Sequence, residues 1–348
     1  MILKAKFQIS KSKVVDEYNK LKELADIIAY SVKSNPHITK ILEEKTDSSF
    51  LLHHINELKQ VNDYSKVWFM LHSPDNSELN IIFSKKINNF IIDNTNDLNF
   101  FLDYLNKNNL KVNLLLRMRL KEYTVQTGRF FVFGMYSKQI NTLIPKLKEN
   151  PNINKLGVHF HRKTQNLSEW SLIRELNDSL SQETWKAIDY LDIGGGVPVA
   201  YKNISSSAID IIFKKIKELK VFLNSKNIKM IMEPGRAIAA PSAKLITTIK
   251  NIVDNNIFID GSVFNCSMDT IVSSIKLLVE NESKDTQGKP YVIKGASPAS
   301  EDIFRYRVYF KEGYEPKIGD KLIFMNAGAY IYYTDLFNFE RPEIEFVD

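Results

Sequence analysis

A lysine stands at the end of an apolar run near the beginning of the sequence. The run is IIAYSVKSN, residues 27–35, and its lysine is Lys33. Such a run is typical of a buried strand, where a charged ammonium group is costly unless the protein uses it. Lysine amines form Schiff bases with carbonyl compounds, so Lys33 is a candidate for covalent chemistry.

Two glycine-bearing segments further along the chain are suited to an anion. LDIGGGVP has three consecutive glycines at 194–196, where backbone amides can approach an anion without interference from side chains. A tight turn without a ligand is the alternative explanation for these glycines alone. MEPGRA offers Gly235 and Arg236 beside Glu233. An anion site built from both segments would hold a phosphate.

A phosphate site together with a reactive lysine indicates pyridoxal 5′-phosphate (PLP) as the cofactor. Lys33 would form an aldimine with its aldehyde, and a charged group would set the protonation state of its ring nitrogen. A carboxylate such as Glu233 keeps that nitrogen protonated, so that the ring can accept the electrons of a carbanion at Cα. An arginine in that place would be expected in a racemase. We expect no metal site.

Eight short apolar runs, with helical patterns between most of them, would position these residues. The first run ends at Lys33, and the others are Phe50–Leu52, Val67–Leu71, Phe90–Ile92, Val112–Leu116, Leu156–Phe160, Tyr190–Ile193 and Ile228–Met232. Another helical pattern starts at residue 11 and continues through Ala25 to Ile28. Eight strand–helix units predict the α/β fold class, as a (β/α)8 TIM-type barrel with its active residues at the carboxyl ends of the strands.

Several residues whose side chains could take part in catalysis or binding lie at or just after those strand ends. They are Lys33, His54, Arg117 and His161. The two glycine-bearing segments follow the seventh and eighth strands, whose loops often form the phosphate site of a barrel. The barrel therefore predicts one site that contains the lysine and the phosphate-binding loops.

The pattern of residue types changes after Pro241. The remaining runs are β-branched and aromatic and are separated by Gly, Pro and Asn, which is typical of an antiparallel β-domain. We expect the PLP-binding barrel at residues 11–241 and the C-terminal β-domain at 242–348. The strand-like residues 1–10 would join the second sheet.

Composition narrows the classes of protein that the chain can belong to. Its 348 residues are 44% hydrophobic, which is enough for one large domain and a smaller one. Cys266 is the only cysteine, which excludes an internal disulfide and fits a reducing compartment. No apolar stretch is long enough to span a bilayer, and lysines interrupt the first residues too early for a signal peptide. The net charge of +6 is dispersed rather than clustered. We expect a cytoplasmic protein that binds neither nucleic acid nor membranes.

The chain resembles the fold-type III PLP-dependent decarboxylases over nearly its whole length. This alanine-racemase-like group contains the diaminopimelate, ornithine and arginine decarboxylases. The resemblance lies in the order of YSVKSNP, GVHFHRKTQ, LDIGGGVP, EPGR and GAY followed by FNFERP. It implies that Lys33 carries the cofactor, that His161 stacks on the pyridine ring, and that two chains form a homodimer with shared active sites.

The resemblance also implies a set of cofactor-binding residues. Thr164 stands where the family usually has a phosphate-binding serine, and Arg117 matches a family arginine near the cofactor. His159 alternates with His161, and we expect it to point the other way, into packing. The full set is Lys33, Arg117, His161, Thr164, Gly195, Gly196, Glu233, Gly235, Arg236 and Tyr330.

One loop departs from the family. The family pattern Gly-x-x-Cys-(Asp/Glu)-Ser-x-Asp reads GASPASED at 295–302. Pro298 replaces a cysteine that, in the family, reaches across the dimer interface and is associated with protonating Cα. Ala299 replaces an acidic residue that helps to bind a distal amine, whereas Ser300 and Asp302 remain in register. The proton could instead come from Lys33, Ser297, Ser300 or water. Cys266 is expected to be a small core residue.

FLLHHINEL is a second departure. Relatives usually carry Asp at the position of Leu51 and a small residue near His54. His54 either polarises the surroundings of the cofactor or packs beneath a loop.

The sequence thus predicts a PLP-dependent carboxy-lyase that removes the α-carboxylate of an amino acid or of an amino-acid moiety in a larger, secondary-metabolite-like molecule. The altered loop argues against ordinary lysine, ornithine or diaminopimelate. Two alternatives remain open. One is another PLP reaction such as racemisation, against which Glu233 argues. The other is a catalytically silent homologue that binds a partner protein, which the lost cysteine favours and the lysine with its phosphate site disfavours.

Overall fold

The computed structural model of the chain describes residues 4–120, 133–204, 206–283, 285–286, 288–331, 334 and 336–348. The chain divides into two compact units. The barrel unit consists of Tyr18–Pro198 and Ser207–Gly235, and the sheet unit of Met1–Glu17, Val199–Ser206 and Arg236–Asp348. No helix within the described ranges is long and apolar enough to cross a lipid bilayer.

Eight parallel strands close into a barrel in the order of the sequence, and β9 completes the ring by pairing with β2. The strands are β2 (Ile27–Ser31), β3 (Ser49–Leu52), β4 (Val67–Leu71), β5 (Asn89–Ile92), β6 (Val112–Arg117), β7 (Ile153–His159), β8 (Tyr190–Asp192) and β9 (Lys229–Met232). This barrel confirms the predicted fold class. The first strand is shorter than predicted, because it ends at Ser31 and a 3-10 turn, η1 (Val32–Ser34), follows it.

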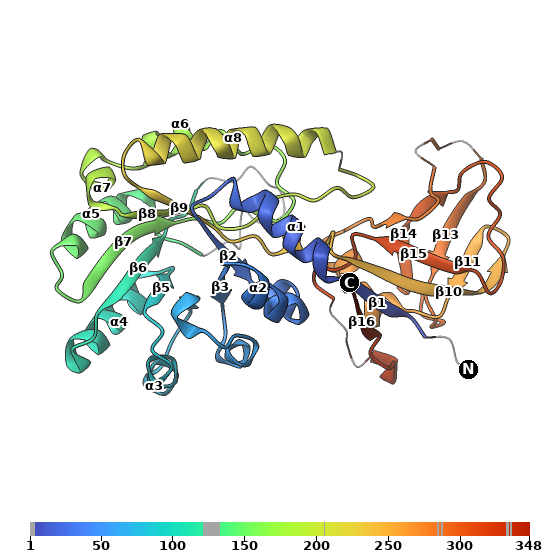
Figure 1. Ribbon diagram of the computed structural model, residues 1–348, viewed down its shortest axis with the longest axis horizontal. Helices are drawn as coiled ribbons and strands as arrows, with labels where there is room; N and C mark the ends of the chain where they lie inside the picture. The colour runs from blue at the N-terminus through green and yellow to red at the C-terminus, as the bar shows by residue number, and fades with distance from the viewer. Residues whose placement is uncertain are drawn as a thin grey trace. The chain divides into compact units, whose positions relative to one another are not determined.

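Helices surround the strands of the barrel unit (Figure 1). The helix α4 illustrates how they form: the side chain of Asn94 accepts the Asp97 amide at the first turn, and Asn109 ends the helix with a left-handed φ of 49°. The helices that lie in this unit are α2 (Thr39–Lys45), α3 (Asn76–Ser84), α4 (Thr95–Asn108), α5 (Ser137–Lys148), α6 (Leu172–Ser179), α7 (Gln182–Ala187) and α8 (Ser206–Asn224).

The first helix, α1 (Lys11–Lys22), is shorter than its sequence pattern predicted. The prediction that it continues through Ala25 to Ile28 was wrong. The chain turns where the Leu24 amide donates to the Leu21 carbonyl, and the β-branched Ile27 and Ile28 then begin β2.

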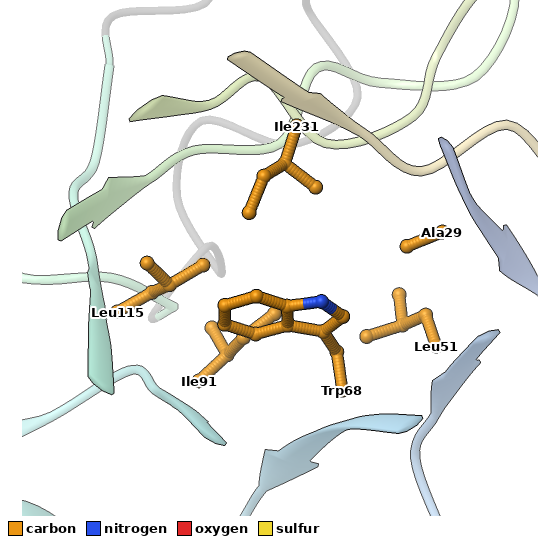
Figure 2. Close-up of a cluster of buried hydrophobic side chains, with 6 residues drawn as sticks. All are labelled: Ala29, Leu51, Trp68, Ile91, Leu115 and Ile231. Atoms are coloured by element: carbon orange, nitrogen blue, oxygen red, sulfur yellow. The ribbon is translucent and has the colours of Figure 1, made fainter. Parts of the chain in front are cut away.

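A layer of apolar side chains fills the interior of the barrel, as a closed barrel of this size requires. Figure 2 shows the indole of Trp68 surrounded by the other side chains of this layer. Six different strands contribute the members, all of them at least 96% buried: Ala29, Leu51, Trp68, Ile91, Leu115 and Ile231. The layer gives the strand ends a rigid base.

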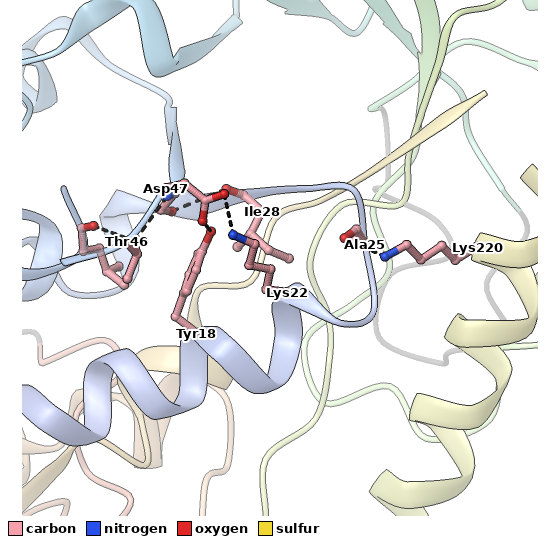
Figure 3. A network of polar contacts seen from close by, with 9 residues as sticks. Tyr18, Lys22, Ala25, Ile28, Thr46, Asp47 and Lys220 are labelled. Atoms are coloured by element: carbon pink, nitrogen blue, oxygen red, sulfur yellow. Dashed lines mark hydrogen bonds and ion pairs between the residues drawn. The ribbon is translucent and has the colours of Figure 1, made fainter. Parts of the chain in front are cut away.

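Polar contacts join α1 to the segment between α2 and β3. The Tyr18 hydroxyl donates to Asp47 Oδ1 at 2.6 Å, and the Lys22 ammonium donates to Asp47 Oδ2 at 2.5 Å (Figure 3). Nearby, Lys220 of α8 donates to the Ala25 carbonyl at 3.0 Å. These contacts fix the segments on either side of β2 and thus support the turn that carries Lys33.

The sheet unit contains an eight-stranded sheet among its described residues. Its strands are β1 (Lys6–Ser10), β10 (Ala243–Val253), β11 (Asn256–Ile259), β12 (Leu278–Val279), β13 (Pro290–Lys294), β14 (Ile303–Tyr309), β15 (Lys321–Met325) and β16 (Glu343–Val347). The opening strand β1 pairs with β10, and Ile2 and Leu3 of the predicted strand lie outside the described residues. The sheet is mixed rather than purely antiparallel, because β1 pairs in parallel with β16 and β11 with β13. Its short helices are α9 (Arg236–Ala239), α10 (Val263–Cys266) and α11 (Met268–Val272).

Candidate active site

Lys33 lies in the turn η1, directly after the carboxyl end of β2. Its neighbours Val32 and Ser34 are buried, whereas Lys33 itself is exposed. The prediction that the Lys33 ammonium is buried is therefore wrong. The strand ends before Lys33, and the turn directs the amine out of the core. The Lys33 Nζ atom lies 3.0 Å from His53 Nε2.

Glu233 follows β9, the last strand of the barrel, and is 2% exposed. Its Oε2 atom lies 3.2 Å from His159 Nε2, and its Oε1 atom has no hydrogen-bond partner among the described residues. Burial raises the pKa of Glu233 to about 7, although the Asp192 carboxyl and the charges of Lys33 and Arg117 act in the opposite direction. Near neutral pH this carboxyl can therefore either hold or release a proton.

The sequence predicts that His159 points away from the site, and this prediction is wrong. His159 is completely buried, and its ring contacts the Glu233 carboxylate. The physical reason is that residues two apart on an extended chain share a face, so His159 and His161 point to the same side. Burial lowers the pKa of His159 to about 4, which leaves the ring neutral at pH 7.

His161 occupies the other side of the Glu233 carboxylate. Its Nδ1 atom lies 4.0 Å from Glu233 Oε2 and accepts the Gly195 amide at 3.2 Å. The side chain is 36% exposed, so one part of the ring is open to a ligand. The two histidines therefore differ: His159 is a buried neighbour of Glu233, and His161 is the accessible one.

The glycine loop after β8 is packed tightly against backbone atoms of the loop after β7. Gly194 and Gly196 have φ angles of 64° and 88°, which side chains rarely adopt. A Cβ atom at Gly196 would lie 2.6 Å from the Arg162 carbonyl oxygen, and one at Gly194 would lie 2.4 Å from that of Phe160. The Gly194 amide donates to Asp192 Oδ1, and burial raises the pKa of the Asp192 carboxyl.

The loop after β9 closes against the turn of Lys33. A Cβ atom at Gly235 would lie 1.9 Å from Ser34 Oγ, so that only a glycine lets these two loops approach so closely. The Ser31 amide also donates to the Pro234 carbonyl at 3.3 Å. The lysine turn and the predicted phosphate loop are therefore in direct contact.

Arg117 and Thr164 flank this part of the barrel. Arg117 is the last residue of β6 and pairs in register with His159 of β7, and its guanidinium lies 5.4 Å from the ring centre of Phe133. Thr164 lies half-buried in the loop after β7. In the same loop the buried Arg162 pairs with Glu175 of α6, which fixes the backbone that the Gly196 loop contacts.

Arg236 and Tyr330 come together in the sheet unit. Arg236 begins α9, is 4% exposed, and donates to Asp269 and to the Tyr201 hydroxyl at 3.1 Å. Its guanidinium also lies 4.8 Å from the centre of the Tyr330 ring. Burial lowers the pKa of Arg236, but the Tyr201 hydroxyl and the Asp269 carboxylate together raise it above its usual value, so its charge is permanent.

The altered loop at 295–302 is held by its own aspartate. Asp302 is 1% exposed, and its carboxylate accepts the Val263 amide, the Ser297 amide and the Ser297 hydroxyl at 2.8–2.9 Å. Ser300 is exposed. Cys266 is buried, and burial raises the pKa of its thiol, so it does not replace the missing family cysteine as an accessible acid.

His53 and Glu57 are site residues that the sequence analysis missed. The sequence singled out His54, but His54 is exposed and its Nδ1 atom accepts the Asn56 amide as the cap of η3 (Ile55–Gln60). Leu51 lies in the apolar layer, and His53, two residues later, lies beside Lys33. The sequence feature that could have identified His53 is the alternation of side chains along the strand, which places Leu51 and His53 on the same face.

The arrangement combines groups suited to an aldehyde cofactor. An exposed amine follows β2, a buried carboxyl with an unpartnered oxygen follows β9, and the positive charge of Lys33 acts on that carboxyl.

Two groups of described side chains also have the spacing that a metal ion requires. They are His159, Asp192 and Glu233, and His72, Asp93 and Asp97.

Comparison with known proteins identifies the family. Residues 11–240 match the family described as pyridoxal-dependent decarboxylase, pyridoxal binding domain. The diaminopimelate decarboxylase of Aquifex aeolicus (strain VF5) is 24% identical over 328 residues, which is 87% of this chain and 76% of that protein.

Two solved structures share the fold. The lysine/ornithine decarboxylase of Vibrio vulnificus, complexed with putrescine, superposes with a TM-score of 0.78 and 20% identity, covering 99% of this chain and 94% of that one. The arginine decarboxylase of Paramecium bursaria Chlorella virus gives a TM-score of 0.79 and 20% identity, covering 99% and 96%. The family match extends over the whole barrel, from α1 to α9. The chain therefore belongs to the pyridoxal-dependent decarboxylases, carboxy-lyases whose cofactor is PLP.

Proposed function

We propose that this PLP-dependent amino-acid decarboxylase removes the α-carboxylate of an amino acid, or of an amino-acid moiety in a larger, secondary-metabolite-like molecule. The observation that carries the proposal is Glu233, a buried carboxyl with one unpartnered oxygen at the carboxyl end of β9. A buried polar atom without a partner is unfavourable unless a ligand completes it. A protonated ring nitrogen is such a ligand.

The residues of the barrel unit fit PLP. The contacts of Gly194, Gly196 and Gly235 leave no room for a side chain, as a loop that approaches a phosphate requires. Lys33 is exposed at the adjoining turn, where its amine is available to an aldehyde. His161 is partly exposed beside Glu233, where an aromatic ring can stack on a flat ligand.

Each residue then has a distinct task. Lys33 would hold the cofactor and be displaced by the amino group of the substrate. Glu233 would hold a proton at the pyridine nitrogen, and neutral His159 would keep the Glu233 carboxylate in place. When bound, PLP supplies an acceptor for the electron pair that remains at Cα when the carboxylate leaves as carbon dioxide.

The remaining predicted residues stay proposed cofactor ligands. His161 would cover one face of the ring, and Arg117 would contribute positive charge near it. Five residues would bind the phosphate: Thr164, Gly195, Gly196, Gly235 and Arg236. Tyr330, which stacks on the guanidinium of Arg236, would join them.

The substrate proposal rests on the loop at 295–302. Pro298 has no thiol that could donate a proton, and Ala299 has no carboxylate. This loop therefore lacks the acidic residue that binds the distal amine of a diamino acid in the family. Ser297, Ser300 and Asp302 remain as polar groups. Asp302 already accepts three hydrogen bonds within the loop, which favours a structural role for it. Ser297 or Ser300 is the better proposed donor to Cα.

The proposed assembly is a cytoplasmic homodimer with shared active sites, supported by the family resemblance. Analytical ultracentrifugation of the full-length protein with PLP should give twice the mass of one chain. A single-chain mass at concentrations where the enzyme is active would contradict the shared sites.

Release of carbon dioxide tests the function. The purified protein with PLP should release carbon dioxide from one or more compounds in a panel of amino acids and amino-acid conjugates, and a Lys33→Ala variant should not. No release from any of them, with PLP bound, would contradict the proposal. Formation of D-amino acids from L-amino acids would indicate racemisation instead, and a protein that stays colourless with added PLP would indicate a silent homologue.

A further inference from the structure

The ring of His53 lies within hydrogen-bond distance of the Lys33 amine. His53 follows β3 directly, its side chain is 24% exposed, and its Nε2 atom lies 3.0 Å from Lys33 Nζ. A lysine ammonium can only donate hydrogen bonds, so Nε2 of His53 accepts this one. The neutral imidazole ring must then carry its own proton on Nδ1.

Glu57 of η3 lies near that second nitrogen. Its Oε2 atom lies 3.9 Å from His53 Nδ1 and accepts the backbone amides of His53 at 2.6 Å and of His54 at 3.2 Å. His53 Nδ1 is buried, and no described residue forms a hydrogen bond with it. The order carboxylate, imidazole, amine resembles the arrangement in which a third group holds a base that serves a nucleophile, although the distance between Glu57 and His53 is longer than a hydrogen bond.

We propose that His53 is a positioning residue through which the Lys33 amine loses and regains its proton. In this step an N–H bond of Nζ breaks, an N–H bond of Nε2 forms, and the electron pair stays on Nζ as a lone pair. The positive charge moves to the imidazole, whose Nδ1–H faces Glu57. The inference rests on the proposed function of Lys33, because only an unprotonated amine can bond to an aldehyde carbon.

The surrounding groups keep the His53 ring neutral, so that its Nε2 atom can act as a proton acceptor. The groups that face His53 are Lys33 after β2, Glu57 in η3, His159 at the end of β7 and Arg117 at the end of β6. Burial lowers the pKa of His53 well below its usual value, and the charge of Lys33 lowers it further. The ring is therefore neutral while Lys33 is charged. Once Lys33 gives up its proton, its charge no longer opposes protonation of the ring.

His54 provides a matched control for His53. It is the same residue type, adjacent in the chain, but it is exposed and caps η3. A histidine-to-glutamine change at either position keeps a hydrogen-bond acceptor and removes a group that can carry a proton. A difference between H53Q and H54Q therefore reports on proton transfer at Lys33 rather than on the loss of a histidine.

Reattachment of PLP to Lys33 provides a readout that does not depend on the substrate. The cofactor of the full-length enzyme is released with hydroxylamine, PLP is added back, and the absorption band of the lysine-bound cofactor is followed between about pH 6 and about pH 9. The proteins compared are the wild type, H53Q, H53A and H54Q.

We expect H53Q to attach PLP about a hundredfold more slowly than the wild type, the usual size of a positioned acid or base, and H54Q to match the wild type. Added imidazole should restore part of the rate of H53A, more strongly at higher pH, where more imidazole is unprotonated. A wild-type rate in H53Q would overturn the inference, as would an H53A rate that imidazole does not change. If the wild type itself forms no lysine-bound band, the proposed role of Lys33 fails, and this inference fails with it.

Discussion

The Nε2 atom of His159 lies 3.2 Å from Oε2 of Glu233, with both side chains at most 2% exposed. This contact joins the end of β7 to the end of β9 inside the barrel unit. It holds the Glu233 carboxyl in place. Because burial raises the pKa of this carboxyl to about 7, both its protonated and its ionised form are populated at neutral pH. The consequences can be measured without a substrate.

Stability of the cofactor-free protein should fall as pH rises through the range in which Glu233 titrates. Its pKa rises from the ordinary 4.5 to about 7 on folding, so the folded state binds more protons than the unfolded state between these values. Glu233 therefore costs the folded protein about 3 kcal/mol once the pH exceeds 7, and nothing below about pH 4. We expect Glu233→Gln to be more stable than the wild type by about this amount at pH 8, and much less so at pH 5.

Urea unfolding at the two pH values measures this difference. The matched control is Glu44→Gln, which makes the same change at an exposed position of α2. Equal pH dependence in the wild type and Glu233→Gln would show that Glu233 ionises normally and would contradict its burial.

Gly196→Ala should abolish the tight approach of the glycine loop. The new Cβ atom would meet the carbonyl oxygens of Arg162 and Lys163 at 2.6 and 2.9 Å, so the loop must move. We expect PLP affinity, measured by equilibrium titration, to fall at least about tenfold, a loss of about 1.4 kcal/mol. Gly313→Ala is the control, because its φ of 79° is similarly strained but nothing lies within 4 Å. Equal effects on PLP affinity would argue against the loop as the phosphate site.

Trp68→Ala should remove the centre of the apolar layer that supports the strand ends. Trp68 is 4% exposed, and its ring also meets Tyr190 edge-on at 5.7 Å. We expect a loss of about 3–5 kcal/mol in the free energy of unfolding. Val221→Ala on α8, where the side chain is 71% exposed, should change stability by less than about 0.5 kcal/mol. Similar losses for both variants in chemical denaturation would contradict the assigned core.

Tyr18→Phe should destabilise the protein more than Lys22→Ala, although both side chains bind Asp47. The Tyr18 hydroxyl is on a 2% exposed side chain, whereas Lys22 is 50% exposed, so water screens its ion pair. We expect about 1–2 kcal/mol for Tyr18→Phe and less than about 1 kcal/mol for Lys22→Ala. The reverse order in thermal or urea unfolding would mean that the ion pair carries the contact.

The barrel could be predicted from the sequence because parallel strands buried on both faces appear as short, continuous apolar runs. All four residues of β5 are buried, for example, and its run Phe90–Ile92 is almost the whole strand. The exact ends were harder to predict. The sequence predicts that Lys33 ends a strand, but the chain leaves the sheet at Ser31 and turns, since nothing in local propensity separates the two cases.

The candidate site was predicted only in part. Lys33, Glu233 and the glycine loops were found because each has an unusual residue type next to an apolar run. His53 was missed although the alternation of the strand places it on the same face as Leu51, because its importance comes from a contact with a residue twenty positions earlier. The orientation of His159 was mistaken because the alternation of the strand was applied to residues that share a face.

Covalent labelling of Lys33 tests the central claim most directly. The purified protein with PLP is reduced with borohydride, which fixes a lysine-bound cofactor irreversibly, and its peptides are analysed by mass spectrometry. We expect the added mass on the peptide that contains Lys33, and none in Lys33→Ala. A label on another lysine, or no label on a protein that still releases carbon dioxide with PLP, would contradict the account.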